Sequence, residues 1–520
     1  MIFNIKIPPH KERMLSRINL LQATFFKSSE LILRSMSTKR KCAFVDGKWV
    51  GAASGKTFPV MNPVDCSIIE NVPDMDAADT KKAINAAHKA FQTFRKTTAK
   101  ERSDLLRSWY NLMVKHSEEL AEIMTKENGK SLDESRAEIR YGNSFVEWFA
   151  EEARRINGEV LQSPVKNREL LLIKQPVGVS AFITPWNFPH AMITRKAGAA
   201  LAAGCTCVIK PSEDTPLSAL ALASLAEEAG FPAGVINVLT TSTENSVAVG
   251  QELCSNPKVR ALSFTGSTAV GKTLYKQCAD TMKRLSLELG GNAPYIVFES
   301  ADVNLAVSGA IASKFRNSGQ TCISANRFFI HSKIYDEFVC KFMTKIESEI
   351  KMGDGSKKGN THGPLIKSSQ LKIVSDLVND AKAKGATVHC GGKPLTELGP
   401  LFYAPTVITD VTKSMEIYAK EIFGPVAVIH KFDDEEDVIQ RANETPVGLA
   451  GYFFSRDISQ IFRVARNLEV GMIGVNEGLI SCAEAAFGGV KESGIGREGS
   501  SHGIDEYVDI KYLCIGNVHH

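Results

Sequence analysis

Apolar residues recur along the chain with two different periods, one typical of helices and one typical of buried strands. Between Asp76 and Phe94 they recur at helical spacing, which predicts an amphipathic helix capped by Asp74 or Asp76. A second helical pattern covers about 100–128 and ends at Gly129. The sequence therefore predicts two helical regions before residue 130.

From residue 177 to 290, short apolar runs alternate with helical patterns. Such alternation predicts parallel βαβ units, with helices on both faces of one sheet. Ligands bind such sheets at the carboxyl ends of the strands. The expected strands are 177–183, 205–209, 235–239, 261–264 and 284–289, and the expected helices end near 203, 229, 254 and 279.

The same alternation continues beyond residue 290 with different turn residues, which predicts a second α/β domain facing the first across a cleft. A glycine-rich stretch, 487–499, is expected to form a loop. The expected helices are 302–316, 334–350 and 367–384, and the expected strands are 328–331, 402–408, 426–432 and 450–454.

The composition is that of an average globular protein, with 43% hydrophobic and 23% charged residues. It excludes collagen-like, mucin-like and largely disordered chains. The net charge of +4 argues against a nucleic-acid partner, and the chain has no run of about 18 apolar residues that would span a membrane. A chain of 520 residues indicates roughly two to four domains.

The small net charge conceals a basic N-terminal segment. Residues 1–41 contain nine Lys or Arg and two acids, so they carry +7 while the remainder carries −3. Basic, acid-poor and hydroxyl-rich composition is typical of a mitochondrial transit peptide, and residues 1–36 are interpreted as one. A basic tail without a targeting role and a leader that starts at Met14 are the open alternatives. The eleven cysteines are odd in number and lack paired spacing, which favours a reducing compartment.

Three residues have side chains suited to acyl chemistry at a carbonyl. Cys322 follows a glycine turn, where its thiol would face a cleft as a nucleophile; a buried inert thiol is the alternative. Glu288 ends an apolar strand, where burial would raise its pKa and make it a general base, or it is a partly exposed strand-end acid. Asn187 lies in a turn stiffened by two prolines and offers an oxyanion donor, or it bonds its own backbone.

Other segments suit a dinucleotide. The strand ending at Phe264 continues into a glycine turn and a helix, where backbone N–H groups favour phosphate, although the pattern is not G-x-G-x-x-G. Lys210 and Glu213 follow a strand and suit ribose hydroxyls, and a carboxylate there would repel a 2′-phosphate. Glu421 is another acid just before a strand. Taken singly, each of these charged residues is also a surface salt-bridge candidate.

Six of these segments together resemble the aldehyde dehydrogenase superfamily. In chain order they are Pro185-Trp-Asn-Phe-Pro189, Lys210-Pro-Ser-Glu213, Phe264-Thr-Gly-Ser267, Leu287-Glu-Leu-Gly-Gly291, Gly319-Gln-Thr-Cys322 and Glu421-Ile-Phe-Gly-Pro425, within a match over roughly residues 44–515. The resemblance implies an α/β fold with a Rossmann-type NAD-binding domain, an α/β catalytic domain and a small β oligomerisation arm. The implied boundaries are 42–157 and 180–290 for NAD binding, 291–490 for catalysis, and 158–179 with 491–520 for the arm.

The resemblance also implies residue roles. Cys322 would be the nucleophile, Glu288 the base, and Asn187 with the Cys322 backbone N–H the oxyanion hole. NAD would be the cofactor, and no metal is expected. The chain would form a homo-oligomer, a dimer or a tetramer, through a hairpin at about 158–175 and a strand at about 506–515. The implied cofactor-binding residues are Trp186, Lys210, Glu213, Gly266, Ser267, Gly271, Glu421 and Phe423.

Two arginines point to an acidic substrate. Arg195 lies eight residues after Asn187 and Arg316 six before Cys322, and an arginine pair recognises a carboxylate by charge-assisted hydrogen bonds; each arginine could instead cap a helix or pair with an acid. The surrounding residues and the segment 471–481 resemble succinate-semialdehyde dehydrogenases. That resemblance implies that both arginines and Ser481 bind the substrate carboxylate of succinate semialdehyde in the mitochondrial matrix, in the last step of γ-aminobutyrate degradation.

Competing interpretations remain. The chain could oxidise glutarate semialdehyde or a broad range of aldehydes, or it could be a catalytically idle, structural member of the fold. One departure from the family concerns Ser324, which occupies a position where some animal members carry a second cysteine. We therefore expect no local disulfide switch at Cys322, and Cys482 is the next cysteine to consider.

Overall fold

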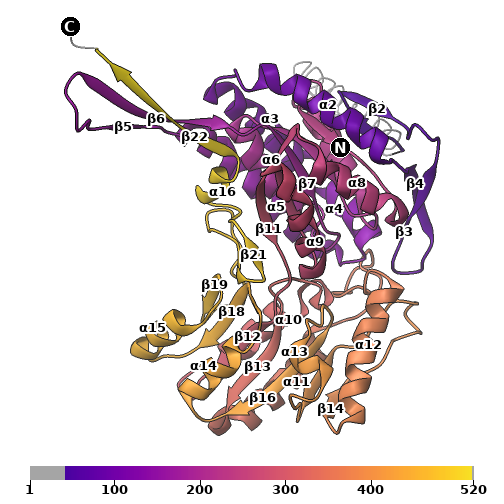
Figure 1. Ribbon diagram of the computed structural model, residues 1–520. Coiled ribbons are helices and arrows are strands. Elements are labelled where there is room, and N and C mark those ends of the chain that lie inside the picture. The colour runs from indigo at the N-terminus through magenta and orange to yellow at the C-terminus, as the bar shows by residue number, and fades with distance from the viewer. Residues whose placement is uncertain (1–40, 518–520) are drawn as a thin grey trace, which may run out of the picture.

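The protein consists of two α/β units joined side by side, with a β arm projecting from the first (Figure 1). The structure is a computed structural model, and it describes residues 41–517. The predicted leader, 1–36, lies outside the described residues. Within the described part, no helix is both long and apolar enough to cross a bilayer.

The first unit is built on an eight-stranded sheet in the order β2-β1-β9-β8-β7-β10-β11-β21. Its five central strands run parallel, whereas β1, β2 and β21 pair antiparallel at the edges. This confirms the predicted βαβ alternation. The strands are β1 Ala43–Val45, β2 Lys48–Val50, β7 Val179–Ile183, β8 Thr206–Lys210, β9 Ile236–Val238, β10 Val259–Thr265, β11 Arg284–Glu288 and β21 Gly494–Ile495.

Helices cover this sheet and bury its apolar side chains. The continuous helix expected over 100–128 is two helices, because His116 leaves the α-helical conformation with φ −102° and ψ 19°. A further helix, α5, was not predicted, and it packs against α3, α4 and α6. The helices are α2 Ala77–Phe94, α3 Ala99–Lys115, α4 Ser117–Asn128, α5 Leu132–Glu152, α6 Ala191–Ala203, α7 Pro216–Glu228, α8 Thr243–Ser255 and α9 Thr268–Cys278.

The second unit has a seven-stranded sheet in the order β14-β15-β16-β13-β12-β18-β19, parallel except for the edge strand β14. The strand expected over 402–408 is shorter and begins at Thr406. The strands are β12 Ala293–Val297, β13 Ala325–His331, β14 Thr387–Cys390, β15 Thr406–Thr409, β16 Val426–Phe432, β18 Ala450–Phe454 and β19 Met472–Val475. The helices are α10 Val303–Phe315, α11 Tyr335–Glu349, α12 Ser368–Ala383, α13 Glu416–Ala419, α14 Glu435–Asn443 and α15 Ile458–Asn467.

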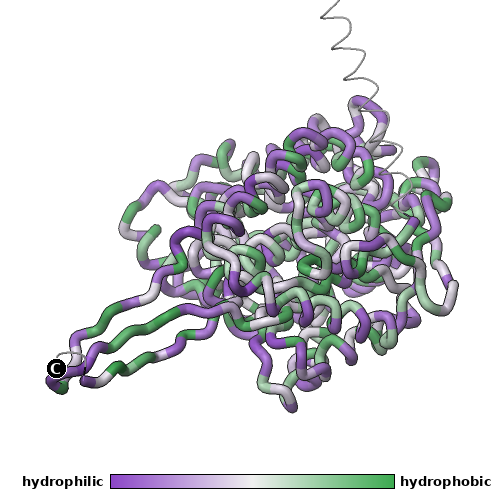
Figure 2. Tube along the Cα trace, turned by 90° about the horizontal axis from the view of Figure 1, so that it is seen from above, coloured by the Kyte–Doolittle hydropathy of each residue, from purple (hydrophilic) through white to green (hydrophobic). Residues whose placement is uncertain are grey.

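The projecting arm is a three-stranded antiparallel sheet in the order β22-β6-β5 (Figures 1 and 2). Its strands are β5 Glu159–Leu161, β6 Arg168–Pro176 and β22 Val508–Gly516. Apolar side chains on it, including Val160 and Ile510, are 72% and 64% exposed. The arm therefore carries an apolar surface that this chain alone does not cover.

Short elements complete the fold. The hairpin β3 Thr57–Met61 and β4 Ile68–Pro73 lies beside the first unit, and α16 His502–Asp505 precedes the arm strand β22. The glycine-rich stretch expected as a loop contains two short strands, β20 Val490–Lys491, which pairs with β17 Val447–Gly448, and β21, which extends the first sheet. The described part of the predicted arm segment 491–520, up to residue 517, thus contributes to the first sheet as well as to the arm.

The candidate functional residues gather where the two units meet. In the first unit, β7, β8, β10 and β11 end at Ile183, Lys210, Thr265 and Glu288. In the second unit, Cys322 lies three residues before the start of β13, and Glu421 precedes β16. The carboxyl ends of the first sheet thus face the nucleophile loop of the second unit, as open α/β sheets place their ligand sites.

Candidate active site

A cavity of about 500 Å³ lies at the carboxyl ends of β7, β8 and β10. Trp186, Lys210, Glu213, Gly266 and Ser267 all line it. Ser267 caps α9 by accepting a hydrogen bond from the backbone of Val270 at 3.4 Å. The cavity thus combines a helix N-terminus, which attracts phosphate, with polar side chains at the strand ends.

The two charged residues of this cavity influence one another. The Lys210 ammonium lies 4.0 Å from the Glu213 carboxylate. Only 5% of the surface of Lys210 is exposed. Burial lowers the pKa of Lys210. Burial acts to raise the pKa of Glu213, but the charges of Lys210 and Lys367, with hydrogen bonds from its own backbone and from Thr243, together outweigh burial and hold that pKa below its usual value. Glu213 is therefore ionised at neutral pH, beside the cavity.

A second cavity of about 340 Å³ continues the first towards Cys322. Both cavities include Trp186, Gly266 and Ser267 in their walls, so they form one channel. At its inner end the rings of Trp186 and Phe423 meet edge to face, with centroids 5.5 Å apart. The Glu421 carboxylate lies there too, and it accepts the backbone N–H of Gly291 at 3.2 Å.

Gly271 is the one predicted cofactor residue that lies outside this channel. It sits in the first turns of α9, where a Cβ atom would come within 2.5 Å of Leu289. It lines a separate cavity beside β11 and β21. Its lack of a side chain serves the packing of helix against strand.

The loop before Cys322 has an unusual backbone. Asn317, Ser318 and Gly319 all adopt positive φ, at 51°, 53° and 77°. A Cβ atom on Gly319 would lie 2.1 Å from the carbonyl of Gly424, so only glycine allows this close approach. Consecutive left-handed residues store strain that packing must hold, and such strain gathers at functional sites.

Cys322 is half-buried at the inner end of the channel. Burial raises the pKa of its thiol to about 12, with Arg195 opposing that rise. The thiol is therefore protonated at neutral pH until a base accepts its proton.

Asn187 is buried beside this loop. Its side-chain N–H donates to the carbonyl of Gln320 at 3.0 Å, and its backbone carbonyl accepts from the Lys130 ammonium at 2.7 Å. Asn187 and Cys322 both line the inner cavity. The structure thus brings the predicted oxyanion donor to the predicted nucleophile.

Glu288 ends β11 with only 2% of its surface exposed. Among the described residues neither of its carboxylate oxygens has a hydrogen-bond partner. Burial, reinforced by the nearby charge of Glu498, raises the pKa of Glu288 well above its usual value, while Arg195 and Lys196 act against this. A buried carboxylate without partners and with a raised pKa is suited to proton transfer.

On the other side of Cys322, a pocket contains both predicted arginines. Arg195, Arg316 and Ser481 line it together with Cys322. Arg316 stacks over the ring of Phe188, 4.7 Å from its centroid. Since Cys322 lines this pocket and the channel, the thiol lies where the two meet.

Tyr141 of α5 is a residue of this pocket that the sequence did not reveal. Its hydroxyl interacts with Ser481 and Arg195, and burial raises its pKa while both arginines oppose the rise. The pocket therefore presents two cations and two hydroxyls, a combination suited to a carboxylate.

Glu498 was also not predicted. It is buried and forms ion pairs with both Arg195 and Lys196. Lys196 also donates to the hydroxyl of Ser263 at 2.8 Å. Although burial opposes it, the charge of Arg195 and Lys196 keeps the pKa of Glu498 below its usual value. Only a fold that returns the C-terminal segment to α6 brings these residues together.

The cysteines near the site are few. Ser324 donates from its hydroxyl to the carbonyl of Lys314 at 3.2 Å, and Cys482 is exposed beside Ser481. All eleven cysteines lie within residues 41–517, and none of them forms a disulfide there. Over the same stretch, no cluster of His, Cys, Asp or Glu has the form of a metal site.

The model of the aldehyde dehydrogenase family matches residues 49–513, so the chain belongs to this family. The sequence is 52% identical over 484 residues to human mitochondrial succinate-semialdehyde dehydrogenase, covering 93% of this chain and 90% of that protein. It is 52% identical over 477 residues to an NADP(+) succinate-semialdehyde dehydrogenase of Escherichia coli, covering 92% and 98% of the two chains. It is 51% identical over 486 residues to a glutarate-semialdehyde dehydrogenase of Pseudomonas aeruginosa, covering 94% and 100%.

Solved structures agree with this assignment and confirm the predicted fold class. Succinate-semialdehyde dehydrogenase from Burkholderia pseudomallei superposes with a TM-score of 0.89 at 52% identity, covering 91% of this chain and 98% of that one. Betaine aldehyde dehydrogenase from Staphylococcus aureus in complex with NAD+ gives a TM-score of 0.89 at 36% identity, covering 92% and 95%. The protein is therefore an enzyme of the aldehyde dehydrogenase family, and its candidate site lies where the two α/β units meet.

Proposed function

We propose that the protein oxidises succinate semialdehyde to succinate with NAD, through a covalent intermediate on Cys322. The observation that carries this proposal is the position of Cys322. Its thiol lies where the dinucleotide channel meets a pocket that holds Arg195, Arg316 and Ser481. An aldehyde bound by its distal carboxylate in that pocket would place its carbonyl next to the thiol.

The first step is addition of the Cys322 sulfur to the aldehyde carbon. The thiol gives up its proton to solvent water, its sulfur forms a C–S bond as the carbonyl π bond breaks, and negative charge develops on the former carbonyl oxygen. A side-chain N–H of Asn187 and the backbone N–H of Cys322 stabilise this oxyanion. Because such donors are fixed before the reaction, they lower the barrier without further reorganisation.

Collapse of the oxyanion breaks the C–H bond and leaves a thioester on Cys322. NAD, when bound, supplies the acceptor for the hydride. Glu288 then takes a proton from water, which attacks the thioester, breaks the C–S bond and releases the carboxylic acid. The raised pKa of Glu288 makes its carboxylate a stronger base than an exposed one.

The features of the channel fit NAD. A helix N-terminus at Ser267 suits the pyrophosphate, and the Trp186 and Phe423 rings with Glu421 suit the nicotinamide end. The ionised Glu213 suits ribose hydroxyls and would repel the 2′-phosphate of NADP. Because the name of the Escherichia coli relative specifies NADP(+), the choice between NAD and NADP has to be measured directly.

Glutarate semialdehyde is the second candidate substrate, because a relative at 51% identity carries that name. It differs by one methylene, and a pocket discriminates one methylene by about 1–3 kcal/mol. Both substrates carry the carboxylate that Arg195, Arg316 and Ser481 would bind. The structure does not favour a broad aldehyde oxidiser, because a purely apolar substrate would leave Arg316, which contacts aromatic rings and pairs with no carboxylate among the described residues, without an anionic partner.

Location and assembly form part of the proposal. The basic leader, residues 1–36, and the mitochondrial names of relatives support the mitochondrial matrix, and the reaction would then close γ-aminobutyrate degradation. The exposed apolar residues of the arm support a homo-oligomer, a dimer or a tetramer. We infer that 42–157 and 180–290 bind the cofactor, that 291–490 carry out catalysis, and that 158–179 with 491–520 serve assembly mainly through β6 and β22.

Replacement of Cys322 by Ala tests the covalent mechanism. The variant should lose NAD reduction with succinate semialdehyde, while NAD still quenches tryptophan fluorescence with unchanged affinity. Rapid NAD reduction by the variant would contradict the proposal. Cys482→Ala is the matched control, because this exposed thiol lies near the same pocket and should leave turnover unchanged.

A further inference from the structure

We propose that Lys130 and Glu138 are positioning residues that hold the Asn187 oxyanion donor in place against Cys322. This inference rests on the proposed function, because it presumes that Asn187 stabilises an oxyanion. Lys130 lies in the connection between α4 and α5, and Glu138 lies on α5, the helix that sequence patterns did not reveal.

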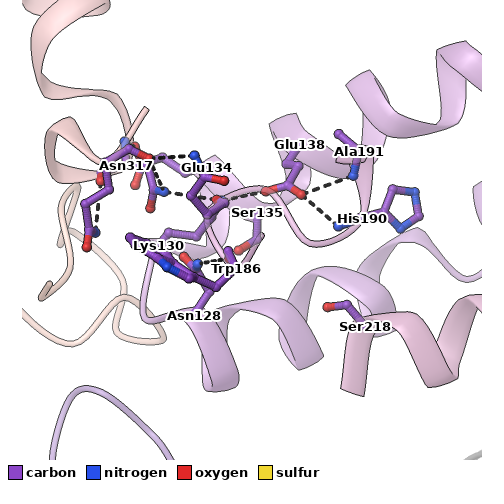
Figure 3. Close-up of polar contacts among 12 residues, drawn as sticks. Asn128, Lys130, Glu134, Ser135, Glu138, Trp186, His190, Ala191, Ser218 and Asn317 are labelled. Atoms are coloured by element: carbon purple, nitrogen blue, oxygen red, sulfur yellow. Dashed lines mark hydrogen bonds and ion pairs between the residues drawn. The ribbon is translucent and has the colours of Figure 1, made fainter. Parts of the chain in front are cut away.

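The ammonium of Lys130 is fully enclosed and has two oxygen partners. It donates to the Glu138 carboxylate at 2.5 Å (Figure 3). It also donates to the backbone carbonyl of Asn187 at 2.7 Å. It also lies over the ring of Phe188, 4.2 Å from the centroid. Lys130 therefore contacts the turn at two successive residues, Asn187 and Phe188.

The second oxygen of Glu138 holds the far end of the same turn. It accepts the backbone N–H groups of His190 and Ala191, at 3.0 and 3.3 Å, where α6 begins (Figure 3). The His190 ring in turn bonds Asn143 of α5 at 2.8 Å. The Lys130–Glu138 pair thus binds the turn on both sides of Phe188 and fixes where Asn187 points.

The nucleophile loop is bound to the same helix. Glu134 of α5 accepts the backbone N–H of Asn317 at 2.6 Å (Figure 3). The Asn317 side chain donates to the Asn187 carbonyl at 3.0 Å. Asn317 is the first of the three consecutive residues with positive φ in the loop that leads to Cys322. One helix of the first unit therefore sets the position of both Asn187 and the Cys322 loop.

The cost of this arrangement argues that it has a role beyond stability. The Lys130 and Glu138 side chains are 1% and 0% exposed, so both charges are removed from water. Buried ion pairs contribute little net stability compared with apolar packing, but they fix geometry when all their hydrogen bonds are made. Here the partners are backbone groups of the turn that carries Asn187, and displacement of a catalytic group by about 1 Å can cost about 100-fold in rate.

Hydrolysis of p-nitrophenyl acetate without NAD provides a readout of the oxyanion donor. Cys322 attacks the ester, a C–S bond forms, nitrophenolate leaves, and water releases acetate, so an oxyanion develops without hydride transfer. Alkylation of Cys322 by iodoacetamide is the companion readout, because a C–S bond forms and iodide leaves without any oxyanion. A residue that acts through Asn187 should affect the first reaction and not the second.

Lys130→Met should lower kcat/KM for ester hydrolysis about 10-fold to 100-fold and leave the rate of Cys322 alkylation unchanged. Since Lys130→Met leaves Glu138 without its cation, Lys130→Met/Glu138→Gln removes both charges and should show the same selective loss. Lys126→Met is the matched control, because this exposed lysine lies in the last turn of the adjoining α4 and should change neither rate.

A double-mutant cycle with Asn187→Ala separates this inference from the proposed function. Once Asn187 has no amide, Lys130→Met should cause no further loss of ester hydrolysis. If the two losses simply multiply, or if Lys130→Met/Glu138→Gln hydrolyses the ester at the wild-type rate, Lys130 does not act through Asn187 and the inference is overturned. If Asn187→Ala itself hydrolyses the ester normally, the oxyanion role in the proposed function fails instead.

Discussion

The guanidinium of Arg195 lies against the carboxylate of Glu498, and both side chains are almost completely buried. Glu498 also pairs with Lys196, so this cluster of three charges carries a net charge of +1. Among the described residues no carboxylate pairs with Arg316, which contacts aromatic rings instead. The two arginines of the pocket therefore differ in how freely each can bind a substrate carboxylate.

We expect Arg316→Met to affect specificity and Arg195→Met to affect both specificity and stability. A charge-assisted hydrogen bond contributes about 1.5–3 kcal/mol, so Arg316→Met should lower kcat/KM for succinate semialdehyde by about 10-fold to 100-fold. Activity with hexanal and the melting temperature should stay the same. Arg195→Met should in addition lower the melting temperature by several degrees, because Glu498 loses a buried partner.

Steady-state kinetics with both aldehydes and calorimetry of both variants measure these effects. Lys272→Met, a half-exposed lysine that pairs with Glu492 far from the pocket, is the control for loss of a cation. Equal losses with succinate semialdehyde and hexanal in Arg316→Met would show that this arginine does not bind the carboxylate.

The buried state of Glu288 predicts a pH dependence. A base must be deprotonated, and burial raises the Glu288 pKa well above 4.5, so the rate of thioester hydrolysis should fall as pH decreases through this raised pKa. Glu288→Gln should show a burst of NADH followed by a slow steady state without that acidic limb. Stopped-flow traces from pH 5 to 9 measure both. If Glu288→Gln shows no burst and keeps the wild-type pH profile, another residue acts as the base.

Glu213 is expected to set the choice between the two nicotinamide cofactors. Its ionised carboxylate would repel the 2′-phosphate of NADP, so Glu213→Gln, which keeps the size and loses the charge, should raise the ratio of NADP to NAD activity by about 10-fold or more. The measurement is kcat/KM for both cofactors at saturating aldehyde. Thr243→Val removes a hydroxyl that bonds Glu213 at 3.2 Å and should change the ratio less. An unchanged ratio in Glu213→Gln would exclude this residue as the discriminator.

A second pH effect should appear in cofactor binding. Burial raises the pKa of Glu421 to about 7, opposed by the Gly291 N–H and by Lys314. If the ionised carboxylate binds ribose, NAD affinity should increase as pH rises through about 7. Lys314→Met should move that transition to higher pH, because it removes the opposing positive charge. Fluorescence titrations with NAD from pH 6 to 9 test this. A transition at the same pH in Lys314→Met would show that Lys314 does not influence the pKa of Glu421.

The strand ends and the residues that follow them were predictable from sequence, because each has a local signal. Cys322, Asn187 and Glu421 follow or precede turns rich in glycine or proline, and short apolar runs mark the parallel strands. The family resemblance then supplied their roles as expectations. The structure adds that these residues converge from two units on one channel.

The missed features have weak or no local signals. Helix α5 begins with a capping box of Ser131 and Glu134, but its first half is rich in charges that mask the apolar stripe. The buried Glu138 and the half-buried Glu134 bind backbone N–H groups of the Asn187 turn and of the Cys322 loop, which lie far away in the chain. Glu498 likewise meets Arg195 only through the return of the C-terminal segment. Contacts of this kind depend on tertiary structure and leave no periodic pattern in the sequence.

The activity proposed for this protein is the oxidation of an aldehyde that carries a distal carboxylate. The most direct measurement is NADH formation by the purified full-length protein with succinate semialdehyde, glutarate semialdehyde and hexanal at fixed NAD, repeated with NADP. We expect the highest kcat/KM for succinate semialdehyde with NAD, at least about 10-fold above hexanal because only succinate semialdehyde binds the arginines. Equal or higher kcat/KM for hexanal would contradict it.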